Sequence, residues 1–220
     1  MNSAQTLCVA ILAVAAAQAD ASVITLQTAY STAGVQGSGN AYRSAVDTAL
    51  LHQGSGYGTA TLASYDNVSN SKLFGGVDSN IAWKATIDFA VAADQAATTW
   101  SFRAGVDFGY GGALFLDGVA VDTKSWDMYW SNNYNNSSQY FLYSTKLGAG
   151  NHTLAIYGLE KCCDGVQQAQ FKIGDGNYTT FASTDGLNPK VAAVPEPATI
   201  ASFALGLGLI AGLRRRGKRG

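Results

Sequence analysis

The chain has 220 residues, enough for one domain of ordinary size with short targeting segments. Charged residues make up only 13% of the sequence, while 47% is hydrophobic, so the chain can bury a core and is not of the disordered class. Five of the fourteen basic residues lie in the last seven positions. The rest of the chain has nine basic and fifteen acidic residues, a net charge of −6. This charge excludes nucleic acid as a partner, because phosphate binding needs a basic surface.

The N-terminal segment predicts a secretory signal peptide over residues 1–19. Residues 7–17 are apolar throughout, and Ala17-Gln18-Ala19 follows as a small-x-small cleavage site. No Lys or Arg precedes the apolar run, so a buried N-terminal helix is the alternative. A signal peptide implies export through the Sec translocon and cleavage by signal peptidase.

Residues 20–193 predict one all-β ectodomain. Short segments rich in β-branched and aromatic residues are separated by turn residues, a pattern typical of a β-sandwich or jelly roll. One short helix is expected over residues 42–52. The predicted strands are 22–27, 58–65, 82–92, 98–106, 112–116, 119–122, 139–147, 152–159, 166–173 and 178–182.

Residues 83–181 resemble the protective-antigen-type β-sandwich of bacterial toxins, glycosidases and fungal adhesins. The resemblance rests on residues 113–122, a strand, an Asp-Gly turn and a strand, and on residues 146–157, two strands around Gly148-Ala149-Gly150. It implies glycan binding, which some members achieve through calcium held by paired aspartates. This chain has no such pair at residues 108–112, so no cofactor is expected; Asp175-Gly176-Asn177 leaves calcium open as a weak candidate.

The segment from Ser125 to Tyr143 is the strongest ligand-binding candidate. Aromatic rings stack on the apolar faces of sugars, amides bond hydroxyl groups, and Tyr, Asn and Ser dominate adaptable binding loops. A neutral polysaccharide suits this low-charge loop best; the alternative is that Trp126 and Trp130 close one end of the core. The candidate residues are Trp126, Tyr129, Trp130, Asn132 and Asn133.

Two adjacent cysteines, Cys162 and Cys163, precede the turn dipeptide Asp164-Gly165. In an oxidising compartment they can pair with each other or with another chain. A vicinal pair closes a strained ring, which could serve as a ligand platform or as a structural clip. All three interpretations stay open here, and zinc is disfavoured because spaced partner ligands are missing.

Catalytic motifs are absent from the sequence. His52 and His152 are its two histidines, and His152 is expected on the exposed face of a strand. No nucleophile elbow, metal-binding His pair or phosphate loop is present. Asp107, Asp117, Asp122 and Asp127 lie near glycines or loops, where turn formation explains most of them. The sequence therefore predicts no catalytic residues, no metal site and no enzyme.

The C-terminal segment 194–219 has three parts in order. Two prolines in Val194-Pro195-Glu196-Pro197 keep the backbone extended and accessible to a processing protease. Residues 198–213 carry no charge and predict a transmembrane helix of about 24 Å at about 1.5 Å per residue. A basic tail then sets the orientation, with the C-terminus cytoplasmic: Arg214, Arg215, Arg216, Lys218 and Arg219.

This order resembles the PEP-CTERM sorting signal of Gram-negative bacteria, which implies processing by exosortase and delivery to the cell surface or exopolysaccharide matrix. The Cys-Cys-x-Gly sequence at residues 162–165 also resembles the signature of the CCXG group of such proteins. We therefore expect an exported, non-catalytic surface or matrix protein that binds carbohydrate, with a transient inner-membrane precursor. A purely structural, self-associating matrix component is the first alternative, and an accessory domain of a glycan-active hydrolase the second.

Overall fold

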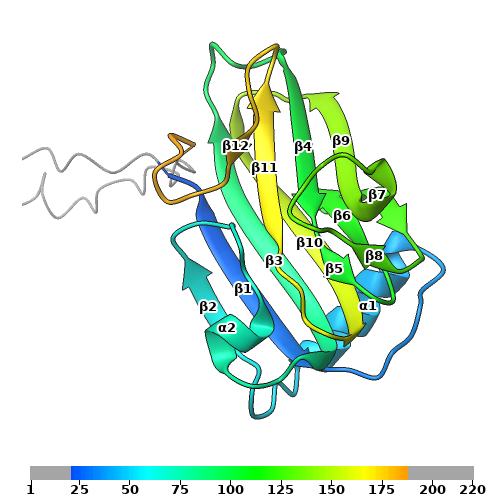
Figure 1. Cartoon of the computed structure of the whole chain (residues 1–220). Coiled ribbons are helices and arrows are strands. Elements are labelled where there is room, and N and C mark those ends of the chain that lie inside the picture. Colours follow the sequence, from blue (N-terminus) through cyan, green and yellow to red (C-terminus); the bar gives the residue numbers. More distant parts are fainter. Residues whose placement is uncertain (1–20, 188–220) are drawn as a thin grey trace, which may run out of the picture.

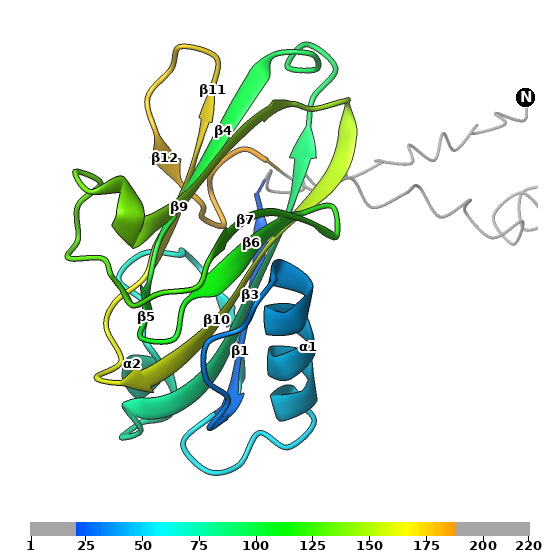
Figure 2. The ribbon, with the colours of Figure 1, turned by 90° about the vertical axis from the view of Figure 1, so that its right-hand side faces the viewer.

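A computed structural model describes residues 21–187 of the chain, which form a β-sandwich with one helix packed outside it (Figures 1 and 2). The predicted signal peptide, the Val-Pro-Glu-Pro motif, the transmembrane helix and the basic tail lie outside these residues. Within residues 21–187, no helix has the length and apolar character needed to span a membrane.

The larger sheet has six strands and is antiparallel throughout. Its longest pairing joins β3 and β10, from Gly150 opposite Val91 to Cys162 opposite Ser79. In spatial order the strands are β2 (Thr59–Leu62), β1 (Val23–Tyr30), β3 (Ser79–Val91), β10 (Gly150–Cys162), β6 (Gly112–Leu116) and β7 (Val119–Lys124).

The smaller sheet covers one face of the larger one (Figure 1). Its strands are β12 (Thr179–Thr180), β11 (Gln168–Ile173), β4 (Thr99–Gly105) and β9 (Tyr140–Lys146). A separate pair joins β5 (Asp107–Phe108) to β8 (Met128–Tyr129), and a 3-10 turn, η1 (Ser137–Gln139), leads into β9.

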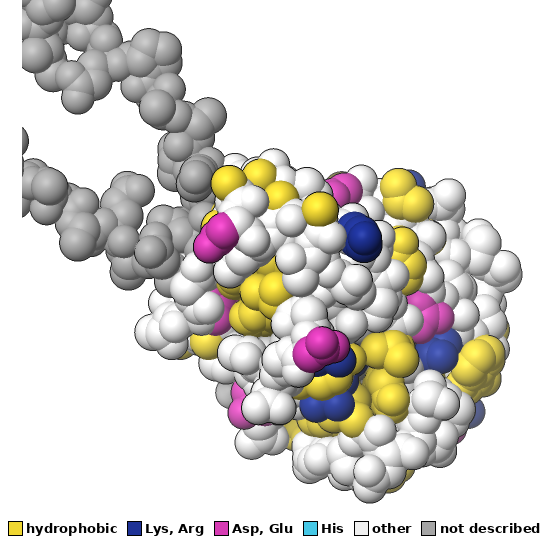
Figure 3. Space-filling view, turned by 90° about the horizontal axis from the view of Figure 1, so that it is seen from above, with side chains coloured by type: hydrophobic (Ala, Val, Ile, Leu, Met, Phe, Trp, Pro, Cys, Tyr) yellow, Lys and Arg dark blue, Asp and Glu magenta, His cyan; other side chains and the backbone are white. Residues whose placement is uncertain are grey.

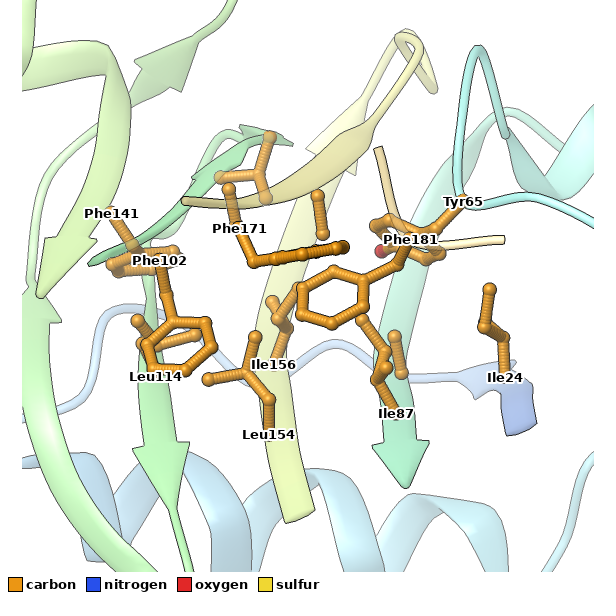
Figure 4. Packing of buried hydrophobic residues seen from close by; sticks show 14 of the residues in the cluster. Ile24, Tyr65, Ile87, Phe102, Leu114, Phe141, Leu154, Ile156, Phe171 and Phe181 are labelled. Atoms are coloured by element: carbon orange, nitrogen blue, oxygen red, sulfur yellow. The ribbon is translucent and has the colours of Figure 1, made fainter. Parts of the chain in front are cut away.

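The core fills the space between the two sheets because side chains alternate between faces along each strand. In β3, Ile81 to Val91 contribute every second residue to the core. Figure 4 shows aromatic rings from the smaller sheet, including Phe102 and Phe171, facing Leu154 and Ile156 of the larger one. The prediction of an all-β sandwich is confirmed.

Helix α1 (Gly39–Leu50) packs on the outer face of the six-stranded sheet (Figure 2). Ser38 begins it as N-cap, accepting a hydrogen bond from Ala41 N at 3.2 Å. Tyr42 and Val46, four residues apart on one helix face, are fully buried in a second apolar cluster with Phe115 and neighbouring sheet residues. A second, five-residue helix is α2 (Asn70–Phe74).

The predicted Asp-Gly hairpin is confirmed between β6 and β7. Asp117 and Gly118 have φ angles of 50° and 78°, the left-handed pair that a two-residue hairpin turn requires.

His152 differs from its expected position on the exposed face of a strand. It lies on the core side of β10, because its even position shares the face of Leu154 and Ile156. Its ring packs at a tilt against Phe89, with centroids 5.7 Å apart, and its Nδ1 lies 2.8 Å from Asp117 Oδ2.

Both ends of the described chain meet at one side of the sandwich. Asp185 Oδ1 accepts hydrogen bonds from Ser22 N at 2.9 Å and from Leu187 N at 3.0 Å, while its Oδ2 accepts from Ala182 N at 3.0 Å. Leu187 O in turn accepts from Ala90 N at 2.8 Å. We call this arrangement the Asp185 latch.

Candidate functional site

Residues 125–139 form a loop, here called the aromatic loop, on the side of the sandwich opposite to the chain ends (Figures 1 and 2). Pairing of β8 with β5 fixes its base, with Tyr129 opposite Asp107 and Met128 opposite Phe108. Met128 is fully buried, so the alternation of the strand turns Tyr129 outward.

The aromatic residues of this loop have different environments. Trp126 is 47% exposed and Tyr129 is 65% exposed. The Trp126 indole N–H donates to Ser138 O at 3.0 Å, and Lys124 Nζ lies 5.2 Å from its ring. Trp126 is thus held in one orientation while its ring still reaches solvent.

Trp130 is only 4% exposed and belongs to the packing of the loop. Its ring covers Gly105, where a Cβ atom would overlap the indole, and Tyr134 packs against it with centroids 5.3 Å apart. Its indole N–H is buried and has no hydrogen-bond partner among the described residues. Of the predicted ligand residues, Trp130 is therefore the one whose ring a ligand does not reach in this structure.

A groove of about 370 Å³ opens beside Tyr129. Hydrogen bonds within the loop shape it: Asn133 Nδ2 donates to Ser131 Oγ at 2.9 Å, Asn136 Oδ1 caps η1 through Ser138 N at 3.1 Å, and Gln139 Oε1 accepts from Tyr129 N. Predicted Tyr129 and Asn133 both line it, whereas Asn132 is exposed in the loop outside the lining. The lining residues are Asp127, Tyr129, Ser131, Asn133, Asn136 and Gln139.

The sequence-based prediction missed Ser131, Asn136 and Gln139 and treated Asp127 as a turn residue. Gln139 comes ten residues after Tyr129 and reaches the groove only because η1 folds the loop back. No local pattern in the sequence indicates that the chain folds back at η1 and brings Gln139 to the groove.

Cys162 and Cys163 lie exposed at the end of β10, with Cα atoms 3.7 Å apart and their sulfurs within bonding distance of each other. The next residue, Asp164, is held firmly: its carboxylate accepts from Asn70 N at 3.0 Å and Ser71 N at 2.7 Å, at the start of α2. The geometry suits a vicinal pair, although oxidation of the cysteines stays a prediction.

Two buried carboxylates lie near this turn. Glu160, on the core side of β10, is 4% exposed; its Oε2 accepts from Gly109 N at 2.7 Å and its Oε1 from Cys162 N at 2.6 Å. Burial, reinforced by the charge of Asp107, raises its pKa to about 7. Burial also raises the pKa of Asp107 to about 6, with further contributions from the charges of Asp127 and Asp164.

Among residues 21–187, no group of three His, Cys, Asp or Glu side chains is arranged to hold a metal ion. Asp175, Gly176 and Asn177 form an exposed turn between β11 and β12, with Gly176 N donating to Ile173 O at 3.1 Å. Calcium at that turn stays an untested expectation.

Comparison with known proteins gives different matches for the C-terminal segment and for the sandwich. Residues 193–216 match the PEP-CTERM protein-sorting motif, which confirms the resemblance of the C-terminal segment. No curated protein matches the sequence.

Among solved structures, the sandwich is similar to the PA14 sugar-binding domain from an RTX adhesin, at 13% identity and a TM-score of 0.50, over 76% of this chain and 99% of that one. The PA14 domain of the MpAFP antifreeze protein aligns at 14% identity and a TM-score of 0.47, over 79% and 94%. The epithelial adhesin 9 A domain from Candida glabrata, in complex with Galβ1-4GlcNAc, aligns at 8% identity and 0.43, over 77% and 94%. The first likeness confirms the protective-antigen-type fold and concerns the fold alone.

Proposed function

We propose that this chain is an exported, non-catalytic surface protein that binds a neutral polysaccharide through the aromatic loop. The observation that carries the proposal is the groove beside Tyr129, which joins an exposed ring to amide and hydroxyl groups. Aromatic rings offer a flat apolar surface to a sugar, and side-chain amides pair with its hydroxyl groups. Asp127 in the lining would repel an anionic sugar at this groove.

The sorting motif at residues 193–216 supports export. We infer a signal peptide over 1–19, an ectodomain over 20–193 and a sorting segment over 194–219 that exosortase processes at Val194-Pro195-Glu196-Pro197. The similarity of the sandwich to a domain described as sugar-binding also supports a carbohydrate ligand.

The test is retention of purified protein on a glycan array and on neutral polysaccharide from the producing cells. Tyr129→Ala should weaken binding by about tenfold, the effect of losing a contact worth about 1.4 kcal/mol, with the free energy of unfolding changed by less than about 0.5 kcal/mol. Trp126 is exposed in the same loop but does not line the groove. The matched control is Tyr30→Ala, which removes a 54% exposed tyrosine from β1.

Trp130→Ala serves as the opposite control. Removing this buried ring should cost about 3–5 kcal/mol of unfolding free energy. If no glycan binds the wild-type chain, or if Tyr129→Ala binds as wild type does, the loop is not the ligand site and a self-associating structural role is favoured.

A further inference from the structure

The outer face of the four-stranded sheet carries a stacked arginine that the proposed glycan groove does not use. In β4, Trp100, Phe102 and Ala104 point into the core, so alternation places Ser101 and Arg103 on the outer face. Gln170 of β11 lies directly opposite Arg103. This places Arg103 near the middle of the sheet, half-buried.

Two tyrosines fix the plane of the Arg103 guanidinium group. Its Cζ lies 3.7 Å from the ring centroid of Tyr134 and 3.8 Å from that of Tyr178. Two rings so close would overlap if they shared one face, so one ring covers each face. Arg103 Nε donates to Gln170 Oε1 at 2.7 Å. Stacking and this hydrogen bond fix the position of the guanidinium group and leave the edge with its terminal N–H donors available. Such an edge can bind a carboxylate through two parallel hydrogen bonds.

A second cation lies on the same face. Lys172 of β11 pairs with Ser101, one step along the face from Arg103, and its Nζ lies 5.4 Å from the same Tyr178 ring. Within residues 21–187, neither cation forms an ion pair. The nearby acids are Asp66, which accepts from Gln168 Nε2 at 2.5 Å, and Asp175 in the following turn. Two like charges beside one ring repel, and an anion between them would relieve that repulsion.

The surroundings define the class of ligand. Around the cations lie neutral hydrogen-bonding groups, among them Gln170, which donates to Thr180 Oγ1 at 3.1 Å, and the Ser101–Ser144 hydroxyl pair at 2.8 Å. Figure 3 views the molecule from above and shows that, on this side, a few basic side chains in blue lie next to hydrophobic ones in yellow on a surface that is mostly uncharged. A chain rich in hydroxyl groups and carrying isolated carboxylates fits this face, whereas two cations are too few for a nucleic acid.

We propose that Arg103 and Lys172 form a binding site for the carboxylate of an acidic, uronate-containing polysaccharide. The site lies outside the groove beside Tyr129 and does not depend on the proposed neutral ligand. A protein with both sites could contact two kinds of matrix polymer at once.

The test compares binding of the full-length chain to polygalacturonate and to its methyl ester, which keeps the sugar backbone and removes the charge. At about 50 mM salt, where screening is weak, the wild-type chain should bind polygalacturonate at least about tenfold more tightly than the ester. Arg103→Gln and Arg103→Lys should both lose about tenfold on polygalacturonate, because lysine keeps the charge but not the planar donor pair.

Arg43→Gln is the matched control and should leave binding unchanged. Arg43 also stacks on a ring, with Cζ 4.9 Å from the Phe115 centroid, but on helix α1. Tyr129→Ala should also bind polygalacturonate normally, which separates this proposal from the neutral-glycan groove. If the Arg103 variants have a lowered melting temperature, Lys172→Gln provides the test. This variant should bind polygalacturonate about threefold more weakly, because it loses one partly screened charge.

The proposal would be overturned by equal binding of polygalacturonate and its ester, by wild-type binding of folded Arg103→Gln, or by unchanged binding of Lys172→Gln. Dextran sulfate and inorganic phosphate test the source of the anion. If either displaces the chain with equal strength and the same dependence on Arg103, the assignment to a carboxylate is wrong.

Discussion

At the scale of single residues, Glu160 is the side chain whose environment is most unusual for its chemistry. Its carboxyl group lies on the core side of β10 and ties Gly109, in the β5–β6 turn, to the end of its own strand. Asp107, 8% exposed, adds a second negative charge to the same region. Deep burial favours the neutral form, which is why the pKa rises despite the hydrogen bonds that oppose it.

This burial predicts that the domain loses stability as pH rises. The folded state holds the Glu160 proton up to a pKa of about 7, against an ordinary value of 4.5. The contribution of Glu160 is therefore complete below pH 4.5 and is lost as pH rises through about 7, by an amount on the order of 2–3 kcal/mol. Glu160→Gln, which imitates the neutral form, should remove the Glu160 part of the stability difference measured by urea unfolding at about pH 5 and about pH 8. Asp107, whose pKa is also raised, to about 6, should keep its own smaller part.

Asp94→Asn is the control, because Asp94 is exposed in the turn after β3 and its replacement should leave the pH dependence intact. A Glu160→Gln variant with the wild-type pH dependence would mean that Glu160 is ionised in the folded protein across this range.

Single residues also show where prediction from sequence stops. Exposure of Trp126 and Tyr129 agrees with a binding loop, but the burial of Trp130 depends on Gly105, 25 positions earlier, which leaves room for the indole. Arg103 gives no sequence signal either, since Tyr134 and Tyr178 reach it from distant segments. Such contacts follow from strand order, which local patterns do not contain.

At the scale of elements, the turn after β10 joins three parts of the fold. Asp164 N donates to Asp78 O at 2.9 Å, and the Asp164 carboxylate holds the first turn of α2. Cys163, with φ of 76°, makes the bend that brings Asp164 into place. The vicinal cysteines therefore occupy a turn whose shape matters to its neighbours.

We predict that these cysteines are oxidised to each other in the exported protein. Intact-mass measurement should find a monomer lighter by two hydrogen atoms than the reduced form, and the difference should vanish in a Cys162→Ser, Cys163→Ser variant. Free thiols in freshly exported protein, or a covalent dimer, would rule out the vicinal pair.

The predicted element boundaries agree with the structure to within about three residues where the sequence pattern is clear. The predicted strand 82–92 corresponds to Ser79–Val91, and the predicted helix 42–52 to Gly39–Leu50. Helix α2 and strands β5 and β8 were not predicted, because segments of five or two residues are too short to display a period and these three are not part of a longer strand-like segment. Their positions come from tertiary contacts such as the hydrogen bonds that Asp164 makes to α2.

At the scale of the whole molecule, the sorting segment and the sandwich make separate predictions. Replacing Pro195, Glu196 and Pro197 with alanine should leave an unprocessed, membrane-bound form, because the extended motif that a protease would recognise is lost. Cell fractionation followed by immunoblotting measures the size and the location of the product.

The matched control for this prediction is Asn188→Ala, a substitution just before the sorting segment. This variant keeps the Val-Pro-Glu-Pro motif and should be processed as the wild-type chain is. Normal processing of the alanine-substituted motif would contradict the sorting proposal.

The Asp185 latch has a mechanical consequence for a protein held by its C-terminal end. Both chain ends leave the sandwich on one side while the aromatic loop lies on the other (Figures 1 and 2). In the proposed surface-attached protein, a pull between a bound polymer and the C-terminal end first loads Asp185 and the Ala90–Leu187 hydrogen bond, which join that end to Ser22 and to the end of β3. The short β12 would peel away first, residue by residue, while the long β3–β10 pairing stays intact. The domain would then lengthen at its C-terminal edge and keep the groove beside Tyr129 folded, whereas the loss of β12 would release Tyr178 and Thr180 from the surroundings of Arg103.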